Sequence, residues 1–162
     1  MQITTSRWKH ILVACLAAFG VAAIGGALTD IGPWYQALKQ PAWKPPDAAF
    51  GPVWTTLFAL CATSAVIGWE RAPSAAARRS MTWAFVMNAA LNVLWSFLFF
   101  KLRRPDLASF EVVLLWVSIV LLIVLLRRWS TSAAWLLAPY LGWVTLATAI
   151  NWSVARHNGP FV

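Results

Sequence analysis

Five apolar stretches, separated by polar connectors, constrain this chain more than any other feature of its sequence. A helix that crosses a bilayer needs about 20 mostly apolar residues, and its backbone groups must be satisfied within the segment. The sequence therefore predicts an all-α integral membrane bundle of five transmembrane helices, forming a single domain over residues 1–162. The predicted spans are Ile11–Leu28, Pro52–Trp69, Met81–Phe100, Leu107–Leu126 and Ala133–Ala155.

The charged residues support a lipid bilayer as the main partner. Only 11% of the chain is charged and 60% is hydrophobic, whereas a soluble domain carries roughly a quarter charged residues. The net charge of +8 comes from basic residues that lie mostly between the apolar stretches. Such residues mark helix ends and meet lipid head groups, which argues against a nucleic-acid partner. They divide almost evenly between the two sides, so the sequence leaves the orientation open.

Residues at the ends of the stretches predict where helices begin. Pro52 suits the first turn of the second helix, where the missing N–H costs nothing. Asp106 is the predicted cap of the fourth helix, and Glu111 is expected in its first turn, at the positive end of the helix dipole. Either Ser130 or Ser132 is expected to cap the fifth helix.

The long connector between the first two spans is rich in tryptophan and proline. It covers about residues 29–51, and together with the start of the next span it includes Trp34, Trp43, Trp54, Pro41, Pro45, Pro46 and Pro52. Prolines prevent a further span, and they also keep a long loop ordered by restricting the unfolded chain. We predict that this segment is a lid over the mouth of a ligand pocket.

Polar residues inside the third span are a first candidate for that pocket. Asn88 and Asn92 lie four residues apart, on one face of a helix that Trp95 and Phe99 extend as an aromatic stripe. Such amides most often form hydrogen bonds between membrane helices, at about 0.6 kcal/mol each. They would alternatively bind the polar edge of a ligand. The same two interpretations apply to Asn151 in the fifth span.

The fifth span offers a second candidate face. Pro139 removes a backbone hydrogen bond and should loosen the preceding turn. Tyr140, Trp143 and Ala147 then recur at spacings of three and four, with Ile150 one turn further on. Helix packing and pocket lining both fit this pattern.

No residue pattern in the chain predicts an enzyme site or a metal site. His10 and His157 lie at the chain ends, and Glu111 has no second carboxylate in its span. Cys15 and Cys61 lie within apolar stretches, where thiols behave as small hydrophobic groups. The residues therefore favour a binding protein that needs no cofactor, and any chemistry would have to come from the ligand, from light or from tryptophan.

Several motifs in a fixed order resemble the translocator protein family, also called tryptophan-rich sensory proteins or peripheral benzodiazepine receptors. They are WY at Trp34–Tyr35, PAWKPP at Pro41–Pro46, GPVW ending at Trp54, NxxWxxxFF at Asn92–Phe100, and PYLGW followed by ATAIN in the fifth span. The match extends over nearly the whole chain.

The resemblance implies a five-helix bundle, commonly a homodimer, that binds porphyrins such as protoporphyrin IX and haem for sensing, sequestration or transport. Trp43 would belong to the lid, and Lys39 or Lys44 would pair with propionates. With Asn88 and Tyr140 from the spacing argument, the predicted ligand-binding residues are Trp43, Trp54, Asn88, Asn92, Trp95, Phe99, Phe100, Tyr140, Trp143, Ala147 and Ile150. The alternative is light- and oxygen-dependent porphyrin degradation, with Trp54 and Trp143 as the catalytic residues.

Two departures from the family pattern limit which family properties the resemblance implies for this chain. Gln40 stands where relatives often have lysine, and Trp152 replaces the tyrosine of the animal cholesterol motif between Ile150 and Arg156. Cholesterol binding is therefore not expected, since such motifs are weak even when intact. The short N-terminus and the Ala/Arg-rich loops favour a bacterial inner membrane.

Overall fold

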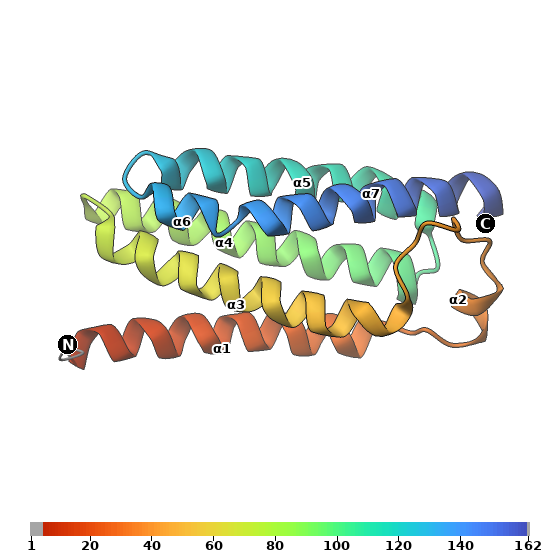
Figure 1. The fold of residues 1–162 in the computed structure, drawn as a ribbon, viewed down its shortest axis with the longest axis horizontal. Coiled ribbons are helices and arrows are strands. Elements are labelled where there is room, and N and C mark those ends of the chain that lie inside the picture. The colour runs from red at the N-terminus through yellow and green to blue at the C-terminus, as the bar shows by residue number, and fades with distance from the viewer. Residues whose placement is uncertain (1–4, 162) are drawn as a thin grey trace.

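The computed structural model describes residues 5–161 as long helices that run side by side (Figure 1). In chain order the elements are α1 (Thr5–Leu28), α2 (Pro33–Ala37), α3 (Asp47–Arg71), α4 (Ala75–Ser96), the π-helix η1 (Phe97–Lys101), α5 (Pro105–Arg127), α6 (Thr131–Trp135) and α7 (Ala138–Asn158). Within residues 5–161 there is no β-strand. The predicted all-α fold is confirmed.

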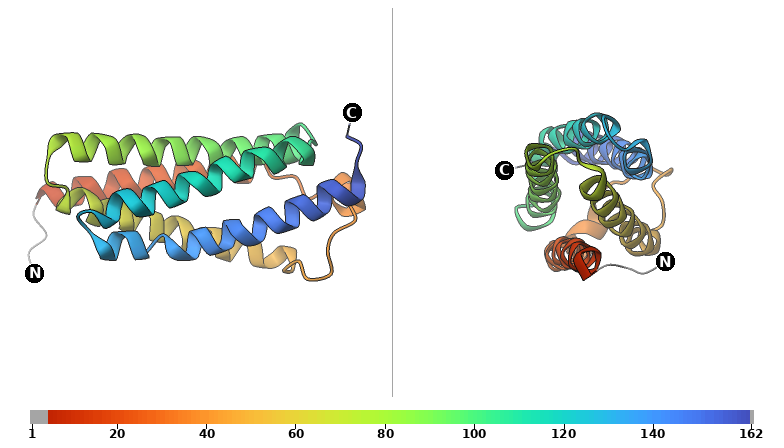
Figure 2. Two further views of the ribbon diagram at one scale, coloured as in Figure 1. Left: turned by 90° about the horizontal axis from the view of Figure 1, so that it is seen from above. Right: turned by 90° about the vertical axis from the view of Figure 1, so that its left-hand side faces the viewer.

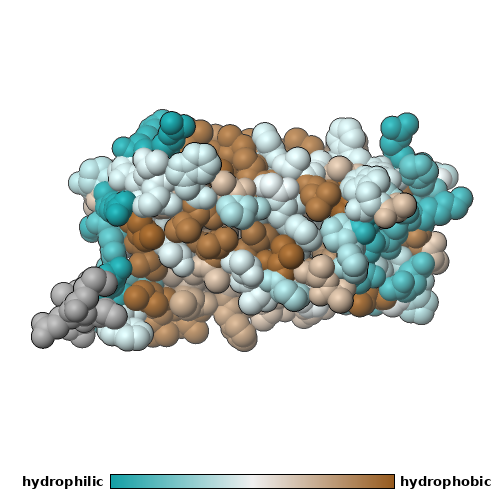
Figure 3. Space-filling view, in the orientation of Figure 1, coloured by the Kyte–Doolittle hydropathy of each residue, from teal (hydrophilic) through white to brown (hydrophobic). Residues whose placement is uncertain are grey.

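Five segments are long and apolar enough to cross a membrane. Two of them combine neighbouring elements, because α4 continues into η1 and α6 leads into α7. The ends of the chain lie at opposite ends of the bundle, as an odd number of spans requires (Figure 1). On the molecular surface, hydrophilic residues gather at both ends and hydrophobic residues lie between them (Figure 3). The protein is therefore an integral membrane protein.

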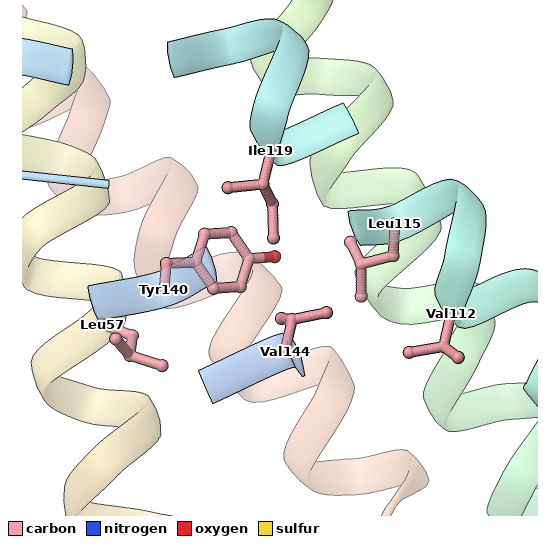
Figure 4. Close-up of a cluster of buried hydrophobic side chains, with 6 residues drawn as sticks. All are labelled: Leu57, Val112, Leu115, Ile119, Tyr140 and Val144. Atoms are coloured by element: carbon pink, nitrogen blue, oxygen red, sulfur yellow. The ribbon is translucent and has the colours of Figure 1, made fainter. Parts of the chain in front are cut away.

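The core of the bundle is built around α5. This helix packs against both α4 and α7, and its buried face meets Tyr140 and Val144 of α7 and Leu57 of α3 (Figure 4). Helix α1 lies on the outside of the bundle, against α3 and α4 (Figure 2). None of its side chains from Arg7 to Leu28 is fully buried. The core therefore excludes α1, which is free to form the wall of a cavity.

The second span begins earlier than its proline predicts. Helix α3 begins at Asp47, with Pro46 as its extended N-cap residue, so Pro52 lies inside the helix rather than in its first turn. The prediction for Pro52 was wrong because the helix begins five residues earlier, directly after Pro45 and Pro46. Asp47 then favours the start of the helix, since a carboxylate complements the positive end of the helix dipole.

The start of the fourth span also differs from its prediction. Pro105 takes the first helical position of α5 and Arg104 is the N-cap residue. Asp106 does not cap the helix, because its carboxylate accepts hydrogen bonds from Arg104 Nε at 2.9 Å and Nη2 at 2.6 Å. Glu111 is the seventh residue of α5, beyond the first turn, and it is buried.

The fifth span is interrupted, as Pro139 predicts. Helix α6 ends at Trp135 and α7 begins at Ala138, so the turn just before the proline is the one that is lost. The predicted cap is also confirmed, because Ser130 Oγ accepts a hydrogen bond from Ala133 N at 3.2 Å. Ser132 does not take this role.

Candidate functional site

A cavity of about 460 Å³ lies between α1, α3, α4 and α7 and reaches the connector between α1 and α3. No residue of α5 lines it. Eight of the predicted ligand-binding residues form part of its wall: Trp54, Asn92, Trp95, Phe99, Phe100, Trp143, Ala147 and Ile150. Residues from three spans that are far apart in the sequence therefore meet at one site.

Aromatic rings form much of the cavity wall. Trp95 stacks on Phe99 with ring centroids 5.2 Å apart, and Phe50 meets Trp143 edge-on at 5.3 Å. Trp143 Nε1 is buried and has no hydrogen-bond partner within the described part of the chain. The wall thus combines flat apolar surfaces with one unused donor, which suits a flat ligand that carries an acceptor.

The π-helix η1 brings two consecutive phenylalanines to the cavity. Leu102 N bonds to Phe97 O at 3.0 Å, five residues back, which widens the helix. Phe99 and Phe100 are both buried and both line the cavity. In a regular α-helix, neighbouring side chains point about 100° apart, so two consecutive residues rarely face the same cavity. The wider π-turn brings both phenylalanines to the cavity, and single π-turns are frequent at functional sites.

Asn88 and Tyr140 lie behind the cavity wall and do not line it. Tyr140 OH donates to Asn88 Oδ1 at 3.3 Å, and Asn88 Nδ2 donates to Ser118 Oγ at 2.8 Å. Asn92 does line the cavity, and its Nδ2 donates to Tyr140 OH at 3.2 Å. Asn88 therefore makes interhelical contacts alone, whereas Asn92 both forms an interhelical hydrogen bond and lines the cavity.

Asn151 links three helices beside the cavity. Its Oδ1 accepts a hydrogen bond from Trp95 Nε1 at 3.2 Å, and its Nδ2 donates to Pro105 O at 2.9 Å and to Ser109 Oγ. Only 1% of the residue is exposed, although it lines the cavity. These bonds fix the plane of the Trp95 ring against α7.

Helix α1 and the residue that follows it, Thr29, contribute a wall of small residues that sequence reasoning missed. Ala22, Gly25, Gly26 and Thr29 all line the cavity. Their spacings of three, four and seven place them on one helix face. This signal was present in the sequence, since small residues at such spacing leave room beside a helix.

Helix α3 contributes an aromatic stripe of which only one member was predicted. Phe50, Trp54 and Phe58 all line the cavity, and Trp54 stacks on Phe58 with ring centroids 5.4 Å apart. They recur at intervals of four residues. Phe50 was missed because the helix was expected to begin at Pro52, whereas Phe58 was missed although its spacing from Trp54 places it on the same face of the predicted span.

Residues of the connector line the cavity at one end of the bundle, and the connector packs against the helices there. Trp34 and Tyr35 of α2 meet Phe99 and Phe100, with ring centroids 6.0 Å and 5.8 Å apart. Trp43 does not line the cavity and is 55% exposed. The reason is a turn closed by the bond from Lys44 N to Pro41 O, which brings Lys44 to the cavity and leaves Trp43 outside.

A pair of reciprocal hydrogen bonds ties the connector to the end of α7. Lys39 N donates to Asn158 Oδ1 at 2.8 Å, and Asn158 Nδ2 donates to Lys39 O at 2.9 Å. The Lys39 side chain is exposed and lies outside the cavity lining. One amide side chain thus holds the backbone of the lid.

Replacing Asn158 with alanine should therefore loosen the lid. Each lost hydrogen bond contributes about 1 kcal/mol, so we expect amide hydrogen exchange over residues 33–44 to become roughly tenfold faster or more. Mass spectrometry of exchanged peptides measures this directly. His157→Ala is the matched control, because among the described residues the His157 side chain bonds only to Ser153, within its own helix. Equal rates of amide exchange over residues 33–44 in both variants would show that the Asn158 hydrogen bonds do not hold the connector in place.

A small charged network lies where the connector meets the cavity. Lys44 Nζ contacts Asp47 Oδ1 and lies 3.1 Å from Tyr35 OH, which donates to Asp47 Oδ1 at 2.9 Å. Burial raises the pKa of Tyr35. Burial acts to lower the pKa of Lys44, but its hydrogen bonds to Asp47 and Tyr35 outweigh this and raise the pKa overall. Lys44 is therefore charged at neutral pH.

Comparison with known proteins assigns this helical membrane protein to a family. Residues 11–156 match the family described as TspO/MBR. The chain belongs to the TspO/MBR family. The family match covers all five spans and the connector, and it confirms the resemblance drawn from the motifs.

Individual TspO/MBR relatives are similar over most of their length. The chain is 37% identical to Protein CrtK of Rhodobacter capsulatus over 160 residues, which is 98% of this chain and 95% of the relative. It is 33% identical to Tryptophan-rich protein TspO of Archaeoglobus fulgidus over 150 residues, 91% and 96% of the two chains. It is 30% identical to the human Translocator protein over 126 residues, 77% and 75% of the two chains.

Proposed function

We propose that this membrane protein binds tetrapyrroles such as protoporphyrin IX and haem, and related hydrophobic ligands, for sensing, sequestration or transport. The observation that carries the proposal is the cavity of about 460 Å³ walled by tryptophan and phenylalanine. Ligand pockets of this kind measure about 300–1,000 Å³, are mostly apolar, and have a few polar groups that orient the ligand. A flat macrocycle matches aromatic walls that offer stacking and edge contacts.

The polar groups of the cavity also support a tetrapyrrole. Trp143 Nε1 is a buried donor without a partner in the described residues, and Lys44 lines the cavity from the connector. A porphyrin carries an apolar ring and carboxylates at one edge, so its carboxylates would lie toward Lys44. The relatives named tryptophan-rich sensory protein and translocator protein agree with sensing and transport as the roles of such binding.

Titration of the purified protein with a porphyrin panel tests the proposal. Tryptophans of the cavity wall should be quenched by bound porphyrin, and the quenching should saturate at one ligand per chain. A smaller aromatic acid of similar charge serves as the control ligand and should quench weakly, because it leaves most of the apolar wall uncovered. Non-saturating quenching that is equal for both compounds would contradict a specific site.

Light- and oxygen-dependent degradation of the bound porphyrin is a second candidate function. It is favoured by one observation, that Trp54 and Trp143 line the same cavity and would both lie beside a bound ring. Under illumination, the enzyme would yield a new product absorption band that is lost in Trp54→Phe and kept in Trp43→Phe, whose side chain lies outside the cavity. Bleaching at the rate of free porphyrin in every variant would contradict this function.

The family resemblance also leads us to propose a homodimer in the inner membrane of a bacterium. Crosslinking in native membranes tests the dimer, and membrane fractionation tests the location.

A further inference from the structure

Lys44 is the only cation and Asp47 the only anion among the described residues that line the cavity. The Lys44 ammonium lies over the rings of Tyr35 and Phe50, 5.4 Å and 5.5 Å from their centroids. Its hydrogen-bond partners are Asp47 and Tyr35. An ammonium has three donors, so one remains for a further acceptor.

The two partners of this ion pair differ in their access to water. The Lys44 side chain is 12% exposed, whereas the Asp47 side chain is 33% exposed. A mostly buried ammonium left without a carboxylate partner has an uncompensated desolvation cost, whereas a carboxylate that turns into water does not. The Lys44 ammonium therefore requires an anionic partner whether or not a ligand is bound, whereas water can solvate the Asp47 carboxylate in place of Lys44.

We propose that Asp47 is an internal stand-in for a ligand carboxylate, and that Lys44 exchanges Asp47 for the carboxylate of a ligand whose apolar body fills the cavity. This inference rests on the proposed function in one respect, that the ligand occupies this cavity. Exchange of one carboxylate for another keeps the ammonium paired throughout binding. The displaced Asp47 turns to the aqueous side, at the first residue of α3.

This exchange of carboxylates predicts that the protein distinguishes an acid from its ester, which packing in the cavity alone would not do. An acid must compete with Asp47 for Lys44, whereas an ester of the same shape has no such competition and gains nothing from Lys44. Removing the negative charge of Asp47 should therefore strengthen binding of the acid and leave the ester unchanged. Removing the charge of Lys44 should abolish the preference for the acid.

The test compares protoporphyrin IX with its dimethyl ester by quenching of tryptophan fluorescence. We expect Asp47→Asn to bind the acid roughly tenfold more tightly than the natural protein does, because the ligand carboxylate no longer competes with Asp47 for a charge-assisted hydrogen bond to Lys44. The dimethyl ester should bind both proteins equally. Lys44→Gln should bind acid and ester with the same affinity.

The outcomes separate this inference from the proposed function. If the natural protein binds neither compound, the proposed function fails and the inference fails with it. If it binds both and Asp47→Asn weakens both equally, Asp47 only supports the lid, and the inference alone is overturned. Should Asp47→Asn not fold, Lys44→Gln decides, since a retained preference for the acid overturns the exchange.

Discussion

Replacing Trp143 with alanine should weaken porphyrin binding by roughly 10–100-fold, because burying an aromatic side chain contributes about 1.5–3 kcal/mol. The ring lines the cavity, meets Phe50 edge-on at 5.3 Å, and carries the unused Nε1 donor. Alanine removes both the stacking surface and the donor. Titration with protoporphyrin IX, followed by quenching of the remaining tryptophans, measures the loss.

Trp152→Ala is the matched control for this change. Trp152 lies on the same helix, is 52% exposed, and does not line the cavity. Both variants lose one tryptophan from α7, so a general effect on folding or on fluorescence should appear in both. An equal loss of affinity in the two variants would remove Trp143 from the site.

Replacing Tyr140 with alanine should destabilise the protein by about 3–5 kcal/mol, the cost of truncating a large aromatic residue in a packed core. Tyr140 is 2% exposed and lies among Leu57, Ile119 and Val144 (Figure 4). Few of these neighbours can move to fill the space, because Ile119 and Val144 are themselves almost completely buried. Reversible unfolding in mixed micelles measures the change in unfolding free energy.

Tyr140→Phe separates the ring from its hydroxyl. This variant keeps the packing and loses only the hydrogen bonds with Asn88 and Asn92, each about 0.6 kcal/mol in a membrane helix bundle. We therefore expect a cost of about 1 kcal/mol. If the alanine and phenylalanine variants have the same free energy of unfolding, the Tyr140 ring does not stabilise the core as described.

Spacing along two helices predicted the faces that α4 and α7 contribute to the cavity wall. Asn92, Trp95 and Phe99 recur at three and four residues, which places them on one face whatever the helix packs against. Trp143 and Ala147 follow the same rule on α7. The resemblance to a family then indicated that these two faces meet at a ligand site, and the structure brings them to one cavity.

Residue spacing did not predict the direction of side chains where a helix departs from α-helical geometry or begins at a different residue than expected. The π-turn at η1 turns both Phe99 and Phe100 inward, and no count of residues reveals its position. The early start of α3 at Asp47 places Phe50 on the same helix face as Trp54. In both places hydrogen bonding of the local backbone, rather than hydropathy, sets the direction of the side chains.

The sequence by itself determined the fold class and the number of spans, because a bilayer requires long apolar segments that satisfy their own backbone hydrogen bonds. It also determined which residues share a helix face. Only the tertiary structure decided what each face meets. Asn88 and Asn92 share a face of α4, yet Asn88 bonds to Ser118 of α5 whereas Asn92 reaches the cavity. The difference arises because α5 packs along α4, while α1 lies outside the core and leaves the space that Asn92 faces.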